Sequence, residues 1–213
     1  MNLKQILRKI LGNSIIDTIN AFVLMLYQYK VPQFYSIGNN SQVGVPIICT
    51  NPQNVILEDN VRINPSAKII TYTGKFIVKK YSLIAYGLTV VTGNHMPTVG
   101  LPQYESGNSH INDKEDDIII EEDCWIGANV TILKGVTIGR GCVIGANTLV
   151  NKSLPPYSVA VGCPARIIAS KFSKEQIIKH EQILYDENER FDIKTLENLF
   201  LEYFVDKRHI GVE

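Results

Sequence analysis

The sequence lacks several features that would assign it to a common functional class. Its 213 residues include 21 basic and 21 acidic ones, so the formal net charge is zero and no basic excess indicates a nucleic-acid partner. No apolar run reaches the roughly eighteen residues that a membrane span needs, because Asp17 and Asn20 interrupt the stretch from Ile15 to Tyr27. No Ala-x-Ala-like cleavage site follows that stretch, so a secretory signal peptide is not expected.

Cysteine is also scarce, and its placement excludes the common zinc motifs. No C-x-x-C spacing occurs among the four cysteines, Cys49, Cys124, Cys142 and Cys163. We expect Cys124 and Cys142 to be reduced core residues. Reduced thiols suit a reducing compartment, so we expect a cytoplasmic protein. The missing zinc-ligand spacing predicts no metal cofactor.

The sequence does contain a strict six-residue period. Aliphatic residues occupy every sixth position at Ile120, Ile126, Ile132, Ile138, Ile144 and Val150. This period fits neither an α-helix nor an ordinary alternating strand, and it is typical of hexapeptide repeats that coil into a parallel β-helix. Weaker runs extend it toward the N-terminus, at Ile37, Val43, Leu57, Ile63, Ile69, Val78, Ile84 and Val90. We therefore expect triangular turns of about eighteen residues around an aliphatic core.

The period divides the chain into three parts. Residues 1–30 have helical apolar spacing, and we expect them to cap the coil or pack against it. A membrane-surface helix is the alternative, since Lys4, Arg8 and Lys9 would suit anionic lipid. Residues 31–170 form the coil, from which a polar loop over 92–117 should project. Residues 171–213 read as a C-terminal helical extension, in which Ser173 and Gln176 form a capping box.

The coil resembles the hexapeptide-repeat acyltransferases. The residues that carry the resemblance lie at 125–132, 135–139 and 143–146, followed by the ending at 155–166. The branch most similar to them contains the sugar and polysaccharide O-acetyltransferases, including galactoside and maltose acetyltransferases. This resemblance implies an all-β core formed by a left-handed parallel β-helix, with N-terminal and C-terminal α-helices. It also implies acetyl-CoA as the acyl donor and a homotrimer whose active sites lie between neighbouring columns.

Transfer of an acetyl group to a sugar hydroxyl needs a base, and histidine is the usual choice near neutral pH. His95 follows Thr92-Gly93-Asn94 where the coil gives way to the loop. In the resembled family a Thr-Gly-x-His at this junction provides the general base, which implies that role for His95. His110, deeper in the loop, is the other candidate, and it could instead grip the substrate.

Further site residues follow from the same resemblance. Asn64 matches, with one residue inserted, an asparagine that stabilises the oxyanion, although an Asn-Pro pair also favours an ordinary turn. Trp125 should point outward, where it could stack on a sugar or on pantetheine, or pack against a subunit. Tyr104 and His110 are expected to shape the acceptor pocket. The expected CoA contacts are Gly127, Ala128, Gly145, Ala146, Asn151, Lys152 and Arg166.

Several functions remain open from the sequence. The most direct one is an acetyl-CoA-dependent O-acetyltransferase acting on a sugar or glycan precursor. A sugar N-acetyltransferase of the same fold is an alternative, as is a non-catalytic trimeric scaffold. A zinc carbonic anhydrase on a similar coil would need three histidine ligands, and only His95 and His110 lie outside the C-terminal extension.

Overall fold

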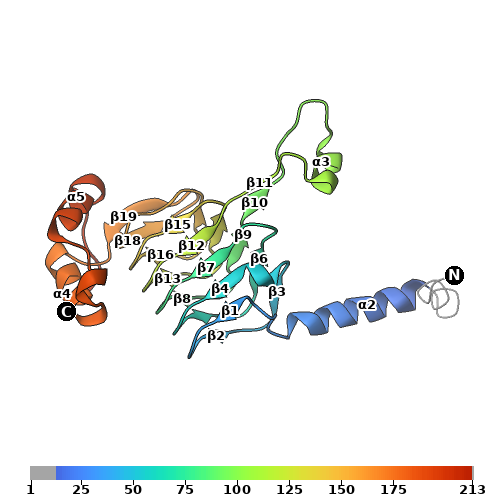
Figure 1. The fold of residues 1–213 in the computed structure, drawn as a ribbon, viewed down its shortest axis with the longest axis horizontal. Helices are drawn as coiled ribbons and strands as arrows, with labels where there is room; N and C mark the ends of the chain where they lie inside the picture. The colour runs from blue at the N-terminus through green and yellow to red at the C-terminus, as the bar shows by residue number, and fades with distance from the viewer. Residues whose placement is uncertain (1–12, 213) are drawn as a thin grey trace.

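A computed structural model describes residues 13–212 of the chain. The part of the predicted N-terminal helical segment that falls on residues 1–12 lies outside the described residues. Within the described range, a coil of short parallel strands forms the centre of the molecule, with helices before and after it (Figure 1).

Three parallel sheets form the faces of the coil. The first face contains β1 (Ser36–Ile37), β4 (Val55–Leu57), β7 (Phe76–Val78), β12 (Ile118–Ile120) and β15 (Thr137–Ile138). The second contains β2 (Gln42–Val43), β5 (Arg62–Ile63), β8 (Leu83–Ile84), β13 (Trp125–Ile126), β16 (Val143–Ile144) and β18 (Ser158–Val161), with β19 (Arg166–Ser170) antiparallel at its edge. The third contains β3 (Ile47–Cys49), β6 (Ala67–Ile70), β9 (Thr89–Val91), β14 (Thr131–Leu133) and β17 (Leu149–Val150).

The predicted six-residue period produces this coil. Ile120 pairs with Ile138, Ile126 with Ile144, and Ile132 with Val150, so equivalent residues of successive turns are eighteen positions apart. Earlier turns are longer, because the Leu57–Val78 pair spans 21 positions. The periodic aliphatic residues from Leu57 onward point inward and are buried in one continuous core. The predicted parallel β-helix is therefore confirmed.

The buried cysteines belong to this core. Cys124 and Cys142 are 2% and 0% exposed, and all four cysteines of the chain are free. Burial raises the pKa of the Cys142 thiol to about 12. Both side chains therefore act as small, protonated core residues, as expected from their inward position in the repeat.

The loop over 92–117 leaves the coil between the third and first faces. Its base is a short antiparallel stem, in which β10 (Gly93–Asn94) pairs with β11 (Lys114–Glu115). A short helix, α3 (Gln103–Ser109), lies at its outer part. Figure 1 shows the loop projecting from the stack, as the break in the period predicted.

Helix α2 (Asn13–Gln28) does not cover the first turn. Most of its large apolar side chains are exposed, including Phe22 at 56% and Leu24 at 64%. The expectation that this segment packs against the coil is therefore wrong for the described part of it. A short 3-10 helix, η1 (Pro52–Asn54), precedes β4. No helix within residues 13–212 combines the length and the apolar character needed to cross a bilayer.

The other end of the coil is covered by α4 (Lys174–Leu184), η2 (Glu187–Glu189) and α5 (Ile193–Tyr203). The predicted capping box is present, since Ser173 and Gln176 bond each other's backbone N–H groups. Tyr157 from the last turn packs with Ile177 of α4 and Leu196 of α5 in a second apolar cluster. Its hydroxyl donates to Glu181 at 2.5 Å, which ties α4 to the coil.

Candidate active site

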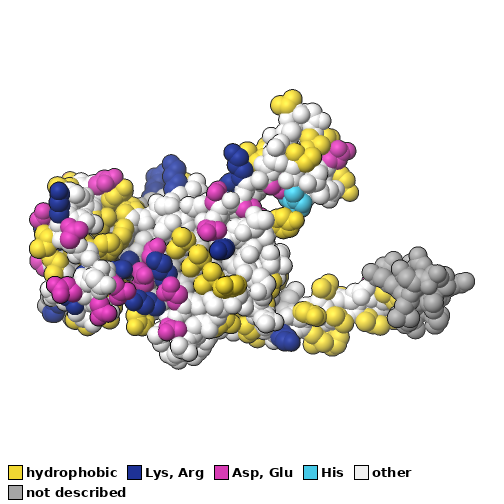
Figure 2. Space-filling model, in the orientation of Figure 1, with side chains coloured by type: hydrophobic (Ala, Val, Ile, Leu, Met, Phe, Trp, Pro, Cys, Tyr) yellow, Lys and Arg dark blue, Asp and Glu magenta, His cyan; other side chains and the backbone are white. Residues whose placement is uncertain are grey.

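His95 lies at the base of the projecting loop, directly after β10. Its Nδ1 lies 2.8 Å from Asp113 Oδ2, and His110 Nδ1 lies 3.0 Å from the same oxygen. The two imidazole rings are 5.3 Å apart between centroids. Both side chains remain accessible, at 49% and 43% exposure, so the cluster presents two imidazoles to solvent around one carboxylate. Figure 2 shows histidine surface on the loop beside acidic side chains.

The proton positions in this cluster follow from the charge of Asp113. Desolvation opposes ionisation, but hydrogen bonds from His110, His95 and the Met96 backbone N–H hold the pKa of Asp113 below its ordinary value. An ionised carboxylate accepts hydrogen bonds only, so each histidine must donate through Nδ1. A neutral His95 then carries its lone pair on Nε2, the nitrogen that faces away from Asp113. This tautomer is the one that a general base requires.

Neighbouring groups fix the loop base beneath the histidines. One oxygen of Glu115, Oε2, accepts from the backbone N–H groups of Tyr72, Thr73 and Gly74 and from the Thr92 hydroxyl. Desolvation opposes the charge, but these donors together lower the pKa of Glu115. The Tyr72 ring stacks on His110 at 5.0 Å with an interplanar angle of 7°. The cluster is thus supported by the turn before β7 as well as by its own stem.

Asn64 does not join His95 within one chain. It follows β5, at the corner between the second and third faces, whereas the loop leaves at the corner between the third and first faces. We call these the Asn64 corner and the loop corner. The Asn64 amide donates to the Ile84 carbonyl oxygen of the next turn of the coil at 3.0 Å, and this bond uses one of its two N–H groups.

The expected CoA-binding glycines and alanines share the Asn64 corner. Gly127 and Gly145 follow the paired residues Ile126 and Ile144. A Cβ on Gly127 would lie 2.6 Å from the Ala146 nitrogen, and one on Gly145 would lie 2.7 Å from Val161 Cγ1. Close stacking of turns therefore requires a glycine at 127, where the contacts are backbone atoms, whereas at Gly145 a valine methyl would have to move. Ala128 is half-buried and Ala146 is exposed, so this edge offers a narrow, small-residue surface.

The remaining predicted contacts are exposed. Trp125 is 55% exposed and points outward between Leu83 and Val143, as its place before an inward isoleucine predicted. Tyr104 lies on α3 and is 84% exposed. Exposed positions are also found for Asn151, Lys152 and Arg166. Lys171, which lies beyond these positions in the sequence, pairs with Asp123 at 2.6 Å and so has a structural partner.

The histidine cluster also has the composition of a metal site. The ligand atoms of His95, His110 and Asp113 all lie within 4.8 Å of one another. Two imidazoles and one carboxylate suit Zn²⁺ and related ions. The hydrogen bonds from His95 and His110 to Asp113 also explain why these three side chains lie close together, so their arrangement does not require a metal ion. A third histidine, which the carbonic anhydrase alternative needs, is not part of this group.

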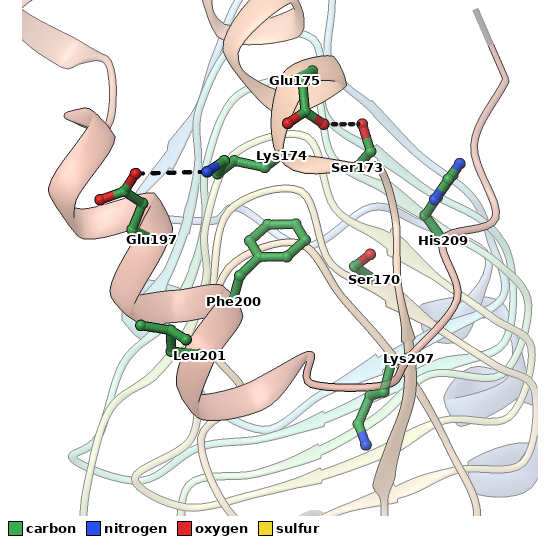
Figure 3. Close-up of a pocket in the computed structure, with 9 residues that line it drawn as sticks. All are labelled: Ser170, Ser173, Lys174, Glu175, Glu197, Phe200, Leu201, Lys207 and His209. Carbon is green, nitrogen blue, oxygen red and sulfur yellow. Dashed lines mark hydrogen bonds and ion pairs between the residues drawn. The ribbon is translucent and has the colours of Figure 1, made fainter.

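A hollow of about 520 Å³ lies elsewhere, between α4, α5, the end of β19 and the segment that follows α5 (Figure 3). Two of its acidic side chains already have partners, since Lys174 pairs with Glu197 at 3.6 Å and Ser173 donates to Glu175 at 3.0 Å. Phe200 lies between the two helices that line it (Figure 3). Figure 1 places these helices at the end of the molecule away from the projecting loop, so this hollow is separate from the histidine cluster.

Asp113 and Tyr72 were missed by reasoning from the sequence. Asp113 belongs to a polar run that resembles a solvated loop, and Tyr72 belongs to an irregular turn before β7. The available signal was the spacing of Asp113 three residues after His110. In the structure His110 ends α3 in the left-handed conformation, with φ of 55°, which turns the chain so that Asp113 meets both histidines.

Known proteins support the identity of the coil. A family model described as bacterial transferase hexapeptide (six repeats) matches residues 117–152. WcaF of Escherichia coli, named as a colanic acid biosynthesis acetyltransferase, is 30% identical over 155 residues, which cover 73% of this chain and 76% of that protein. A galactoside O-acetyltransferase of Lactococcus lactis is 29% identical over 161 residues, covering 75% of this chain and 72% of that protein.

A solved structure agrees with these relatives. A hexapeptide-repeat-containing acetyltransferase of Vibrio cholerae, crystallised with acetyl-coenzyme A, superimposes with a TM-score of 0.59 at 28% identity. The match covers 71% of this chain and 85% of that one. Periodicity, coil geometry and these likenesses agree, and the chain therefore belongs to the family of hexapeptide-repeat acetyltransferases.

Proposed function

We propose that this protein is an acetyl-CoA-dependent O-acetyltransferase that transfers the acetyl group directly to a hydroxyl of a sugar or glycan precursor. The observation that carries the proposal is the hydrogen bond of 2.8 Å between His95 Nδ1 and Asp113 Oδ2. It leaves Nε2 of His95 as the proton acceptor at an accessible site. The relatives named for galactoside acetylation and for colanic acid biosynthesis favour a carbohydrate acceptor.

The reaction needs one base and one oxyanion donor. His95 Nε2 takes the proton of the acceptor hydroxyl while its oxygen attacks the thioester carbonyl carbon. The tetrahedral oxyanion then collapses, the carbon–sulfur bond breaks, and the imidazolium returns the proton to the departing CoA thiolate. Asp113 keeps His95 in the correct tautomer and stabilises its transient positive charge, as a buried or partly screened carboxylate does in other histidine bases. The acetyl group passes directly to the acceptor, without an acyl-enzyme.

The site is completed by a neighbouring copy of the chain. His95 lies at the loop corner, and Asn64, Ala128 and Ala146 lie at the Asn64 corner. A closed threefold arrangement of left-handed columns brings the loop corner of one chain to the Asn64 corner of the next. CoA then lies along the small-residue edge, with Trp125 beside it and Asn151, Lys152 and Arg166 near its polar groups. The Asn64 amide donates to the oxyanion, while Tyr104 and His110 contact the acceptor.

The chain is organised to match this reaction. Residues 31–170 form the catalytic coil, the loop over 92–117 selects the acceptor, and residues 171–213 stabilise the last turns. The N-terminal segment, residues 1–30, is separate from the catalysis. We place the enzyme in the cytoplasm, where acetyl-CoA and activated sugars are both available.

Thermal unfolding with and without acetyl-CoA tests donor binding before any acceptor is known. A ligand at one hundred times its dissociation constant stabilises a protein by about 2.7 kcal/mol, which raises Tm visibly. We expect this shift in wild type and in His95→Ala, since His95 does not hold the donor. No shift at millimolar acetyl-CoA would contradict donor binding.

An acceptor screen then tests the base. Release of CoA thiol in the presence of mono- and oligosaccharides is expected from wild type and is expected to fall about 10²–10⁴-fold in His95→Ala. His209→Ala is the matched control, since that histidine is exposed in the C-terminal segment. Equal activity of the two variants would refute the role of His95, and an acetylated side chain trapped on the reaction path would refute direct transfer.

A further inference from the structure

Helix α2 presents apolar side chains that no part of the described chain covers. Phe22, Leu24 and Leu26 are 56%, 64% and 51% exposed. Figure 2 shows apolar surface along this helix where it extends away from the coil. A helix of this composition in water needs a partner, because exposed apolar area of this extent is unfavourable.

In the second half of α2 the apolar surface runs around the full circumference of the helix. Seven consecutive residues from Ala21 to Tyr27 are apolar or aromatic. At about 3.6 residues per turn they cover nearly two full turns and face every direction. A groove on another protein covers one side of a helix, whereas a hydrocarbon environment surrounds it. The distribution therefore favours lipid over a protein groove.

The end of α2 next to the coil has the side chains of a bilayer interface. Tyr27, Tyr29 and Tyr35 are 73%, 59% and 68% exposed there, and Lys30 lies between them in sequence. Tyrosine rings with one apolar and one polar end gather at the headgroup level of membranes, and lysine reaches toward the headgroups. The side chains at this end of the helix are therefore those expected at the boundary between the acyl layer and water.

Charge and length complete the pattern. Residues 1–12, which precede α2, contain Lys4, Arg8 and Lys9 and no acidic residue in the sequence. Basic residues next to an apolar helix favour anionic lipid. The 16 residues of α2 extend about 24 Å, which is less than the roughly 30 Å of a hydrocarbon core. The described part of the helix is therefore shorter than a bilayer span, and its apolar residues suit one leaflet.

A groove beside the helix continues the same surface onto the coil. A hollow of about 650 Å³ is lined by Leu24 and Tyr27 of α2 and by Ile48 of β3. Ile48 is 40% exposed. Figure 1 places α2 at the opposite end of the long axis from α4 and α5. The first turn of the coil is thus the part of the body nearest to whatever α2 enters.

We propose that α2 docks this enzyme on an anionic lipid bilayer, with its apolar residues in the acyl layer and the exposed tyrosines at the headgroups. The surface is independent of the histidine cluster and of the acetyl transfer. Docking holds the catalytic coil beside the membrane and leaves the C-terminal helices in water.

Flotation of the full-length protein with vesicles tests the proposal. The probes are vesicles of phosphatidylcholine alone and of phosphatidylcholine with phosphatidylglycerol. We expect wild type to float with both, more strongly with the anionic vesicles and less strongly as salt rises. The double variant Phe22→Glu with Leu26→Glu is expected to lower the vesicle partition coefficient at least about tenfold, because it places two charges in the acyl layer.

Matched controls separate docking from misfolding and from self-association. Ile183→Glu on α4, where the side chain is 71% exposed, should float like wild type. The double variant should keep the Tm shift with acetyl-CoA, which shows that its coil is folded. Wild type that fails to float with either vesicle overturns the proposal. A double variant that still floats also overturns the proposal. Sedimentation tests the remaining case: if wild type binds no lipid but forms an oligomer that the double variant cannot form, α2 is a self-association surface and the proposal is wrong.

Discussion

Replacing Asp113 by asparagine is the sharpest test of how the loop prepares its base. In the wild type, Oδ2 of Asp113 accepts from His95 and His110, while Oδ1 accepts from the Met96 backbone N–H at 3.1 Å. Asparagine keeps one accepting oxygen and turns the other position into an NH₂ donor. Either Met96 loses its acceptor or the histidines meet a donor.

The second arrangement changes the tautomer of the base. An NH₂ group facing His95 Nδ1 stabilises the form in which Nδ1 accepts and Nε2 carries the proton. That form cannot deprotonate an acceptor hydroxyl. We expect kcat to fall by about 10²–10³, which corresponds to about 2.7–4.1 kcal/mol of lost transition-state stabilisation. KM for acetyl-CoA should not change, because its proposed site lies at the Asn64 corner.

Steady-state kinetics with a fixed acceptor provides the assay. Asp116→Asn is the control, since Asp116 lies in the same loop and its side chain forms an exposed pair with Lys134 at 3.2 Å. The reasoning fails if Asp113→Asn keeps kcat within about threefold of wild type, a change of under 1 kcal/mol. It also fails if the loss appears in KM for acetyl-CoA alone, because Asp113 would then act through donor binding.

Three further predictions concern stability. Arg140→Met should lower the free energy of unfolding by about 3 kcal/mol in urea titration, because it removes the cation that Glu122 and Glu181 share at 11% and 2% exposure. Lys79 still faces Glu122, and the Tyr157 hydroxyl still donates to Glu181. Lys134→Met, which breaks an exposed pair, should cost under about 1 kcal/mol. Gly127→Ala should lower Tm clearly in circular dichroism, since the added Cβ would meet backbone at 2.6 Å; an unchanged Tm would refute close stacking at that corner. Glu115 has a folded pKa below its ordinary value of 4.5, so the stability from its hydrogen bonds is complete above that pH and is lost as pH falls through the lower folded pKa. The protection factor of the Gly74 amide, which corrects the exchange rate for its intrinsic pH dependence, should fall only there; a loss of protection already near neutral pH would contradict the sign.

The coil was predictable because its signal is local and repeated. The spacing of Ile120, Ile126 and Ile132 indicates the six-residue period and the side chains that point into the core. The pairing of each residue with the one eighteen positions later follows from that period. The start of helix α4 was predictable for a similar reason, since Ser173 and Gln176 are three residues apart. Each turn of the coil repeats the same inward aliphatic residue at every sixth position, so a six-residue pattern predicts the whole stack.

Other parts depend on contacts that short patterns do not encode. The stem of β10 and β11 has only two residue pairs, Gly93 with Glu115 and Asn94 with Lys114, and its residues have little strand preference. The contact of Arg140 with Glu181 joins residues 41 positions apart on different elements. The exposure of α2 was also not predicted, because an apolar helix ordinarily packs on its own domain.

The separation of Asn64 from His95 could have been found from the sequence. Asn64 follows a residue of the second face, and His95 follows the third face, once the period is counted through Val90. Their different corners follow from that count alone. The family resemblance suggested one site for both, and the register shows that a single chain does not bring them to one corner.

The way in which the projecting loop closes has a consequence for how such enzymes diversify. Thr92 bonds the Ile70 carbonyl below it, and Asp116 returns to bond the Thr92 carbonyl at 3.0 Å. Ile118 then pairs with Phe76 as though no residues had intervened. Because the entry and exit of the loop meet on one rung, its length and composition can change without shifting any turn of the coil. In our proposal, acceptor preference can therefore change by replacement of the loop over 92–117, while the proposed CoA site at the Asn64 corner and the aliphatic core stay the same.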